Sequence, residues 1–367
     1  MRKNIKYKFA LITAFIFGIS LVIKAQPSEK HKYISNVYKA FSETNVQIAN
    51  KYGNINVITW EKDSVRIEID IKAIARPDKV EKILNNVDVN FTNSQYYIIA
   101  KLVFNDFKGT ALADFSDMAT TSISGGNKVE INWTIHIPEK ISLSLENKFG
   151  NIYTTNLNGN LDISISNGDF KANNLFGETK LNLEFGNCSI SNMKNAKLVF
   201  NYSEFDLLSA NKLSIESKSS KIEIKKVNEI EINSKRDKYY IDTANVINSG
   251  ADFSYLIISQ LKKSIFSKSK YGSLKIDAVE NGFKYVNLIP TYSDINLSFN
   301  KESSFTFSLT TKKTLTSLPE TFNSLEKIFI DKENEEYKVA GTIGQSQQSL
   351  PEVQINASNG SVVVKFR

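Results

Sequence analysis

The chain has 367 residues, 41% of them hydrophobic and 23% charged, which is a globular composition and excludes wholesale disorder. One cysteine and two histidines exclude a disulfide framework and multi-cysteine zinc sites, and leave little material for histidine-based catalysis. Of the net charge of +7, residues 1–25 contribute +5 and the rest of the chain only +2, so nucleic acid, which needs a concentrated basic face, is not an expected partner.

Residues 1–25 have the pattern of a secretory signal peptide. A basic start precedes an apolar run of 15 residues from Phe9 to Ile23, and Ala25 marks the expected cleavage site. The run is shorter than the ~20 residues of a membrane span, and an uncleaved N-terminal anchor is the alternative. We therefore expect an exported protein in the periplasm, on the outer-membrane surface or outside the cell, with no transmembrane span after signal removal.

Residues 26–140 are predicted to form an N-terminal β cap. Alternating apolar residues over 65–71 indicate a strand, and apolar residues at helical spacing indicate one short helix over 77–87. Residues 105–127 have no period and are predicted to be a long loop, of the kind that is often functional or disordered. His31, close behind the signal, is expected in a disordered leader.

A repeat runs through the following residues. The hexapeptides at 50–55 and 147–152 are identical except for one aromatic residue, and from 143 to 244 apolar or small residues recur every 17 or 18 positions. One such column consists of Ile152, Phe170, Cys188, Phe205, Ile222 and Tyr239. Each unit contains two short runs of alternating apolar and polar residues, which predict strands with one buried face.

Two all-β architectures fit these strands. Asn167-Gly168 is a strong hairpin signal and favours an antiparallel β-sandwich. Later copies have Tyr202-Ser203 or Arg236-Asp237 at the same turn, and a fixed period is required by stacked coils but not by a meander. We therefore predict a single-chain parallel β-solenoid with 17–18-residue coils over 141–299, with the sandwich as the alternative. Residues 300–367 are predicted as an irregular insertion and a closing coil.

The segments 50–55, 133–138 and 143–152, with the later copies, resemble the putative adhesin family of exported bacterial β-strand repeat domains, which is related to the adhesin head domains. The resemblance covers roughly residues 40–300. It implies a right-handed parallel β-solenoid, export, and a role in binding or adhesion. It supplies no catalytic residues.

The segment 211–275 is a candidate binding region because it has 13 basic residues against 7 acidic ones. Stacked coils would align some of them into a basic edge that binds an anionic glycan or lipopolysaccharide by charge and ring stacking. The expected ligand-binding residues are Lys218, Lys235, Arg236, Tyr239 and Tyr271. The alternative is a solvated, lysine-rich face that prevents edge-to-edge aggregation.

No catalytic, metal or cofactor site is expected. Glycoside hydrolysis needs two facing carboxylates, and Asp206 with Glu223 is one stacked pair on a polar face. His136 alternates with apolar residues and has the pattern of a structural, outward histidine, whereas Cys188 falls in an apolar column. The acidic residues at 331–336 are interpreted as a solvated turn.

The sequence therefore predicts an exported, non-enzymatic binding protein of the bacterial cell envelope. Its expected partner is an envelope glycan or an envelope protein, and its oligomeric state is left open. The first alternative is a periplasmic protein-interaction module in envelope signalling, with the loop at 105–127 as its surface. The second alternative is a polysaccharide-active enzyme.

Overall fold

The computed structural model describes residues 27–105, 128–345 and 349–367. The expected signal peptide at 1–25 and nearly all of the expected loop at 105–127 lie outside the described residues. The N-terminal elements are β1 (Ser28–Lys39), β2 (Asn45–Lys51), β3 (Ile55–Trp60), β4 (Ser64–Ala75), α2 (Pro77–Asn86), β5 (Val87–Asn93), β6 (Tyr97–Phe104) and β7 (Lys128–Pro138).

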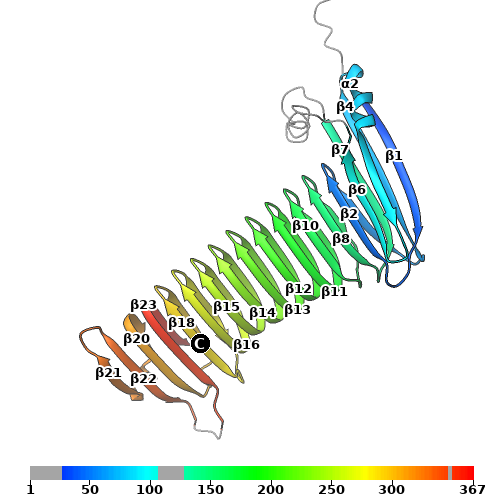
Figure 1. Cartoon of the computed structure of the whole chain (residues 1–367). Coiled ribbons are helices and arrows are strands. Elements are labelled where there is room, and N and C mark those ends of the chain that lie inside the picture. Colours follow the sequence, from blue (N-terminus) through cyan, green and yellow to red (C-terminus); the bar gives the residue numbers. More distant parts are fainter. Residues whose placement is uncertain (1–26, 106–127, 346–348) are drawn as a thin grey trace, which may run out of the picture. The chain divides into compact units, whose positions relative to one another are not determined.

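The regular part of the chain is a row of parallel strands (Figure 1). Its elements are β8 (Ser142–Lys148), β9 (Ile152–Thr154), β10 (Leu161–Ser166), β11 (Phe170–Glu184), β12 (Asn187–Asn201), β13 (Glu204–Lys218), β14 (Lys221–Lys235), β15 (Lys238–Asp252), β16 (Tyr255–Lys270), β17 (Ser273–Val279), β18 (Tyr285–Thr291) and β19 (Asp294–Phe299). The C-terminal elements are β20 (Phe305–Ser317), the 3-10 helix η1 (Glu320–Ser324), β21 (Glu326–Asp331), β22 (Glu336–Ile343) and β23 (Glu352–Phe366).

Each strand from β11 to β15 pairs in parallel with the strand one repeat later. Cys188 on β12 lies opposite Phe205, Phe205 opposite Ile222, and Ile222 opposite Tyr239. The sequence period of 17 residues is therefore the length of one coil. The prediction of an all-β parallel solenoid is confirmed, and the antiparallel sandwich is wrong for these coils because their strands do not pair across the turns.

Each long strand consists of two arms that enclose the core. In β13, Phe205 and Leu207 point inward on the first arm, and Leu213 and Ile215 point inward on the second. Full burial of such a side chain stabilises the fold by roughly 1.5–3 kcal/mol. The arms meet at a bend where asparagine amides of successive coils hydrogen-bond to one another, as in Asn228 to Asn211 (3.2 Å).

The two matching hexapeptides lie on adjacent coils, although 97 positions separate them. β2 pairs in parallel with both β6 and β8, and Asn50 lies opposite Asn147. The Asn50 amide donates a hydrogen bond to Asn147 (3.1 Å), and the Trp133 indole N–H donates one to Asn50 (2.9 Å). The first copy of the repeat is thus part of the same stack as the later copies.

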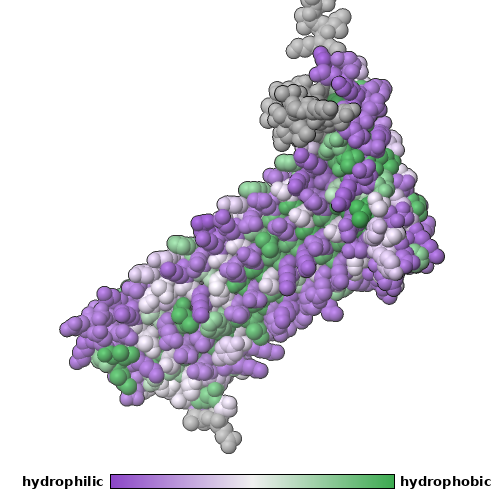
Figure 2. Space-filling view, viewed as in Figure 1, coloured by the Kyte–Doolittle hydropathy of each residue, from purple (hydrophilic) through white to green (hydrophobic). Residues whose placement is uncertain are grey.

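The C-terminal strand completes the stack as the sequence predicts. Along β23, Ile355 lies opposite Leu288 of β18, and Val362 lies opposite Ile295 of β19. β21 and β22 form an antiparallel hairpin beside β20. Hydrophilic side chains cover most of the face of the coils shown in Figure 2, and a small apolar cluster lies over β21.

Contacts divide the chain into two compact units, and the smaller one comprises the described residues 27–33, 70–88, 103–105 and 128–130. It holds α2, at the position where a helix over 77–87 is expected. Pro77 begins this helix, where its missing N–H costs nothing, and the buried side chains of Val80, Ile83 and Leu84 form its inner face.

Candidate functional site

One turn joins each coil to the next, and the first residue of each turn has a positive φ between 49° and 69°. We call this column of turn residues the turn edge. It consists of Tyr52, Phe149, Asn167, Phe185, Tyr202, Ser219, Arg236, Phe253, Tyr271, Tyr292 and Asn359. The turns stack in register because each N–H donates to the next turn, as from Ser219 to the carbonyl of Lys235 (3.0 Å).

Aromatic residues hold most positions of the turn edge, although the left-handed backbone favours glycine or asparagine there. We call Tyr52, Phe149, Phe185, Tyr202, Phe253, Tyr271 and Tyr292 the aromatic ladder. Neighbouring rings are stacked: the centroids of Phe185 and Tyr202 are 5.2 Å apart, and those of Tyr271 and Tyr292 are 5.0 Å apart. Ring stacking between coils therefore offsets the backbone strain of the turns.

The ladder lies at the protein surface. The exposed fraction of its rings runs from 38% for Phe149 to 51% for Tyr292, whereas Tyr52 is buried. Neighbouring rings cover part of each other by stacking. A ring lacks a stacked aromatic neighbour only where the next position of the turn edge has no aromatic residue.

The ladder has two internal gaps, which differ in charge. The first is one coil wide at Asn167, and its turn, Ser166 to Asp169, has no basic residue. The second is two coils wide at Ser219 and Arg236, between Tyr202 and Phe253. We call the second one the basic gap, and it comprises Lys218, Ser219, Lys221, Lys235, Arg236 and Lys238.

The cations of the basic gap are held side by side by the coil register. Lys218 lies opposite Lys235, and Lys221 lies opposite Lys238. Paired strands are ~4.8 Å apart, and like charges directly opposite each other are unfavourable. The Lys218 ammonium lies 5.8 Å from the centroid of the Tyr202 ring, and Glu223 pairs with Lys221 at 2.5 Å. The basic gap is thus a cluster of five cations beside Tyr202, and Glu223 and Asp252 are the acidic residues next to it.

A buried carboxylate supports the backbone beneath the basic gap. Asp237 is 1% exposed, and its oxygens accept hydrogen bonds from the N–H groups of Ser220 (2.7 Å) and Lys235 (2.9 Å). The hydroxyls of Ser217 (2.8 Å) and Ser234 (2.7 Å) donate to it as well. In neighbouring coils a serine takes the same position, as Ser220 does when its hydroxyl accepts from the N–H of Ser203 (3.2 Å). Asp237 therefore fixes the turns that present Ser219 and Arg236.

Four of the five expected ligand-binding residues lie at the surface of this edge. Lys218, Lys235 and Arg236 belong to the basic gap, and Tyr271 belongs to the ladder one coil beyond Phe253. The prediction for Tyr239 is wrong. Its ring is fully buried, its hydroxyl lies 2.6 Å from Ser217, and burial raises the pKa of Tyr239 far above its usual range.

The residues of the site that sequence reasoning missed include three at the turn edge in or beside the basic gap. Tyr202, Ser219 and Phe253 lie on the turn edge, and the recurrence of their positions every 17 residues could have revealed them. The same reasoning could have excluded Tyr239, because that residue falls in the column of Phe205 and Ile222. The turn position and a core position of one repeat lie three residues apart, as Tyr202 and Phe205 do. Aromatic residues occur at both, so the sequence alone does not distinguish them.

The other candidate groups have structural surroundings. Cys188 is buried, and burial raises the pKa of its thiol well above the usual value, so it is not a reactive cysteine. His136 stacks on Trp60 with centroids 5.2 Å apart and lies 3.6 Å from Glu68. Burial first and the neighbouring Glu223 second raise the pKa of Asp206. Asp331 accepts hydrogen bonds from Glu333 and Asn334 within its turn.

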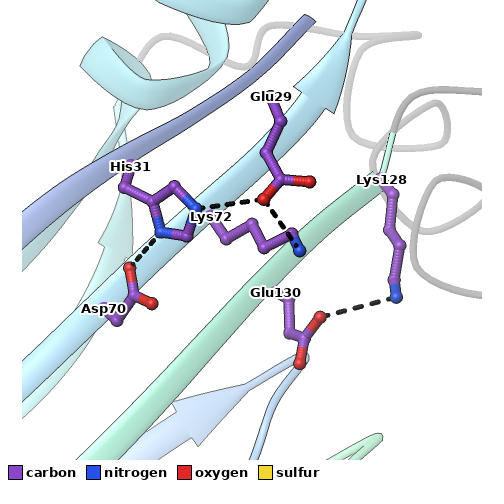
Figure 3. A network of polar contacts seen from close by, with 6 residues as sticks. All are labelled: Glu29, His31, Asp70, Lys72, Lys128 and Glu130. Atoms are coloured by element: carbon purple, nitrogen blue, oxygen red, sulfur yellow. Dashed lines mark hydrogen bonds and ion pairs between the residues drawn. The ribbon is translucent and has the colours of Figure 1, made fainter. Parts of the chain in front are cut away.

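His31 belongs to an ordered network in the smaller unit (Figure 3), and the expectation of a disordered leader is wrong at this residue. Its Nδ1 lies 2.7 Å from Asp70, and its Nε2 lies 3.2 Å from Glu29. Glu29 also pairs with Lys72 at 3.1 Å. The hydrogen bond with Asp70, followed by the one with Glu29, raises the pKa of His31 above its usual 6.5.

This network predicts a pH dependence that is local to the smaller unit. Because the folded-state pKa of His31 is raised, protonated His31 stabilises the folded state. This contribution to the free energy of unfolding is complete below pH ~6.5 and is lost as the pH rises through the raised pKa. We expect an NMR titration of His31 to give a pKa above 6.5, and Asp70→Asn to move it back toward 6.5. An unshifted His31 in the wild-type protein would contradict the network. His136→Gln assigns the two histidine signals.

In the part of the chain that the structure describes, no helix is long and apolar enough to cross a membrane. No protein-family model and no curated protein matches the chain. The solved structures that are similar to it include a putative cell adhesion protein from Clostridium sporogenes (10% identity, 93% of this chain and 100% of that one, TM-score 0.19), a putative adhesin from Bacteroides fragilis (13%, 93% and 99%, 0.31) and a putative lipid binding protein from Parabacteroides distasonis (11%, 74% and 94%, 0.32).

The resemblance to putative adhesins that the sequence indicates thus recurs among solved structures. Sequence identities of 10–13% and TM-scores of 0.19–0.32 are too low to carry a function from these proteins to this one.

Proposed function

We propose that the protein is an exported, non-enzymatic binding protein of the bacterial cell envelope that holds an anionic glycan at its turn edge. The observation that carries this proposal is the basic gap, where five cations gather on two adjacent turns between aromatic rings. Like charges directly opposite each other, as at Lys218 and Lys235, are unfavourable. Glu223 pairs with Lys221 and Asp252 lies opposite Lys235, and an acidic polysaccharide supplies further counter-charge. Its sugar rings also have apolar C–H faces that suit exposed aromatic side chains.

The test is a comparison of two variants with the same loss of charge. Lys218→Gln/Lys235→Gln removes two cations from the basic gap, and Lys262→Gln/Lys263→Gln removes two exposed cations from the middle of β16. Exposed ion pairs contribute about 0.2–1 kcal/mol each. We therefore expect the first variant to bind an acidic polysaccharide about tenfold more weakly and the second to bind it as the wild type does.

The measurement is isothermal titration calorimetry of the purified protein with polygalacturonate and with a sulfated glycan, and neutral dextran is the control ligand. Equal losses in both variants would show that only the net charge matters, and would remove the assignment to the basic gap. A wild-type protein that binds neither acidic glycan would overturn the proposal and favour the protein-interaction module.

A further inference from the structure

Ser219 interrupts the aromatic ladder, because it takes the place in the turn edge that an aromatic residue takes in most other coils. We call this position the missing rung. Its φ of 53° equals that of Tyr202, so the backbone presents both side chains in the same way. At Tyr202 the turn carries a ring, and one coil later it carries only a hydroxymethyl group. The ladder thus lacks one ring at the level of Ser219.

The spacing of the coils suits a ring in that place. Tyr202 and Arg236 are two coils apart, which corresponds to about 10 Å at ~4.8 Å per coil. A ring at the level of Ser219 would therefore lie about 5 Å from each of them. Centroids in the ladder itself are 5.0 Å apart at Phe253 and Tyr271, so a bound ring would have the spacing of a native rung.

The two walls of this space differ in chemistry. On one side lies Tyr202, which stacks on Phe185 and has the Lys218 ammonium over its ring, 5.8 Å from the centroid. On the other side lies the exposed Arg236, whose planar guanidinium can stack on a ring and pair with an acid. Lys218 and Lys235 flank the space on one side of the turns, and Lys221 and Lys238 flank it on the other.

We propose that the missing rung at Ser219 is a subsite for one acidic sugar ring, which stacks between Tyr202 and Arg236. The apolar C–H face of the sugar lies on the tyrosine, and its carboxylate pairs with Lys218 and Lys235. A uronic acid unit of a polysaccharide has this combination of an apolar face and an acid. The inference rests on the proposed function and names the ligand class of the same edge.

The gap at Asn167 offers a natural comparison. There too one ring is missing, between Phe149 and Phe185, and Asn167 has a φ of 57°. Its turn ends in Asp169 and has no basic residue. The gap at Asn167 has no cluster of cations that could pair with the carboxylate of an acidic sugar. We therefore assign the subsite to Ser219 alone.

The test fills each gap with a tyrosine. Ser219→Tyr completes the ladder in the basic gap and keeps all of its cations, whereas Asn167→Tyr completes the ladder in the other gap. With oligogalacturonate as the probe in calorimetry, we expect Ser219→Tyr to weaken binding at least tenfold and Asn167→Tyr to leave it unchanged. Binding by Ser219→Tyr that equals wild-type binding would overturn the subsite, because charge alone would then explain the affinity.

A second variant decides the question if Ser219→Tyr does not fold. Tyr202→Asn removes one wall of the subsite and places in the turn a residue that this edge already tolerates at Asn167. We expect it to weaken oligogalacturonate binding several-fold, and unchanged binding would overturn the subsite. Failure of the wild-type protein to bind any acidic glycan would instead overturn the proposed function, so the two ideas fail in different experiments.

Discussion

Replacing Asp237 by alanine is expected to lower the free energy of unfolding by about 4 kcal/mol. The substitution leaves the buried N–H of Ser220 and the part-buried N–H of Lys235 without this acceptor, and an unsatisfied buried donor costs about 1–3 kcal/mol. The hydroxyls of Ser217 and Ser234 lose a charged acceptor as well. Because these groups form the turns at Ser219 and Arg236, unfolding should begin in this part of the coil stack.

Asp237→Ser is the matched control. Ser220 already accepts the N–H of the preceding turn through its hydroxyl (3.2 Å), so a serine at 237 can accept the N–H of Ser220 in the same way. We expect Asp237→Ser to lower the free energy of unfolding clearly less than Asp237→Ala does. Urea denaturation followed by circular dichroism measures the free energy of unfolding of both variants. Hydrogen exchange shows whether β13 and β14 open first. Equal stability of the alanine variant and the wild type would refute the structural role of the carboxylate.

The regular coils could be predicted from the sequence because burial repeats with the period of the coil. The column of Cys188, Phe205 and Ile222 is apolar in the sequence and buried in the structure, since each coil places the same position against the same interior. The return of the motif at Val353 to Val364 likewise predicts the closing coil, because its inward residues match those of β18 and β19.

The order of the first coils could not be predicted in this way. The hexapeptides at 50–55 and 147–152 show that two coils are alike, but likeness does not say that they are neighbours. β2 is placed beside β8 by pairing across an insertion of more than eighty residues, and β6 occupies its other edge. Such an arrangement depends on tertiary contacts that leave no period in the sequence.

The turn edge could not be predicted from the local backbone preferences of its residues. Tyrosine, phenylalanine and arginine are poor choices for a positive φ, so Tyr202-Ser203 and Arg236-Asp237 do not look like turns of the Asn-Gly kind. In the structure only the first residue of each pair is left-handed, and at Tyr202 ring stacking on Phe185 supports it. The ladder therefore becomes visible only when the coils are stacked, and so does the gap in it.

Gly168 illustrates a second requirement of the same turns, and Gly168→Ala should destabilise the protein by about 3 kcal/mol. A Cβ at this position would lie 2.0 Å from the carbonyl oxygen of Gly150 on the preceding coil, which is well inside contact distance. A Cβ at Gly186 would likewise lie 1.9 Å from the carbonyl oxygen of Gly168, so the glycine turns of adjacent coils are packed too closely for a methyl group.

Gly250→Ala separates this steric effect from the general effect of replacing a glycine. A Cβ at Gly250 would meet its nearest neighbour at 4.0 Å, and alanine loses less backbone freedom on folding. We expect this variant to be as stable as the wild type or slightly more stable in urea. If Gly168→Ala were equally harmless, the carbonyl of Gly150 would have to yield by about 1 Å at little cost, and the close packing of the glycine turns would not determine the coil spacing.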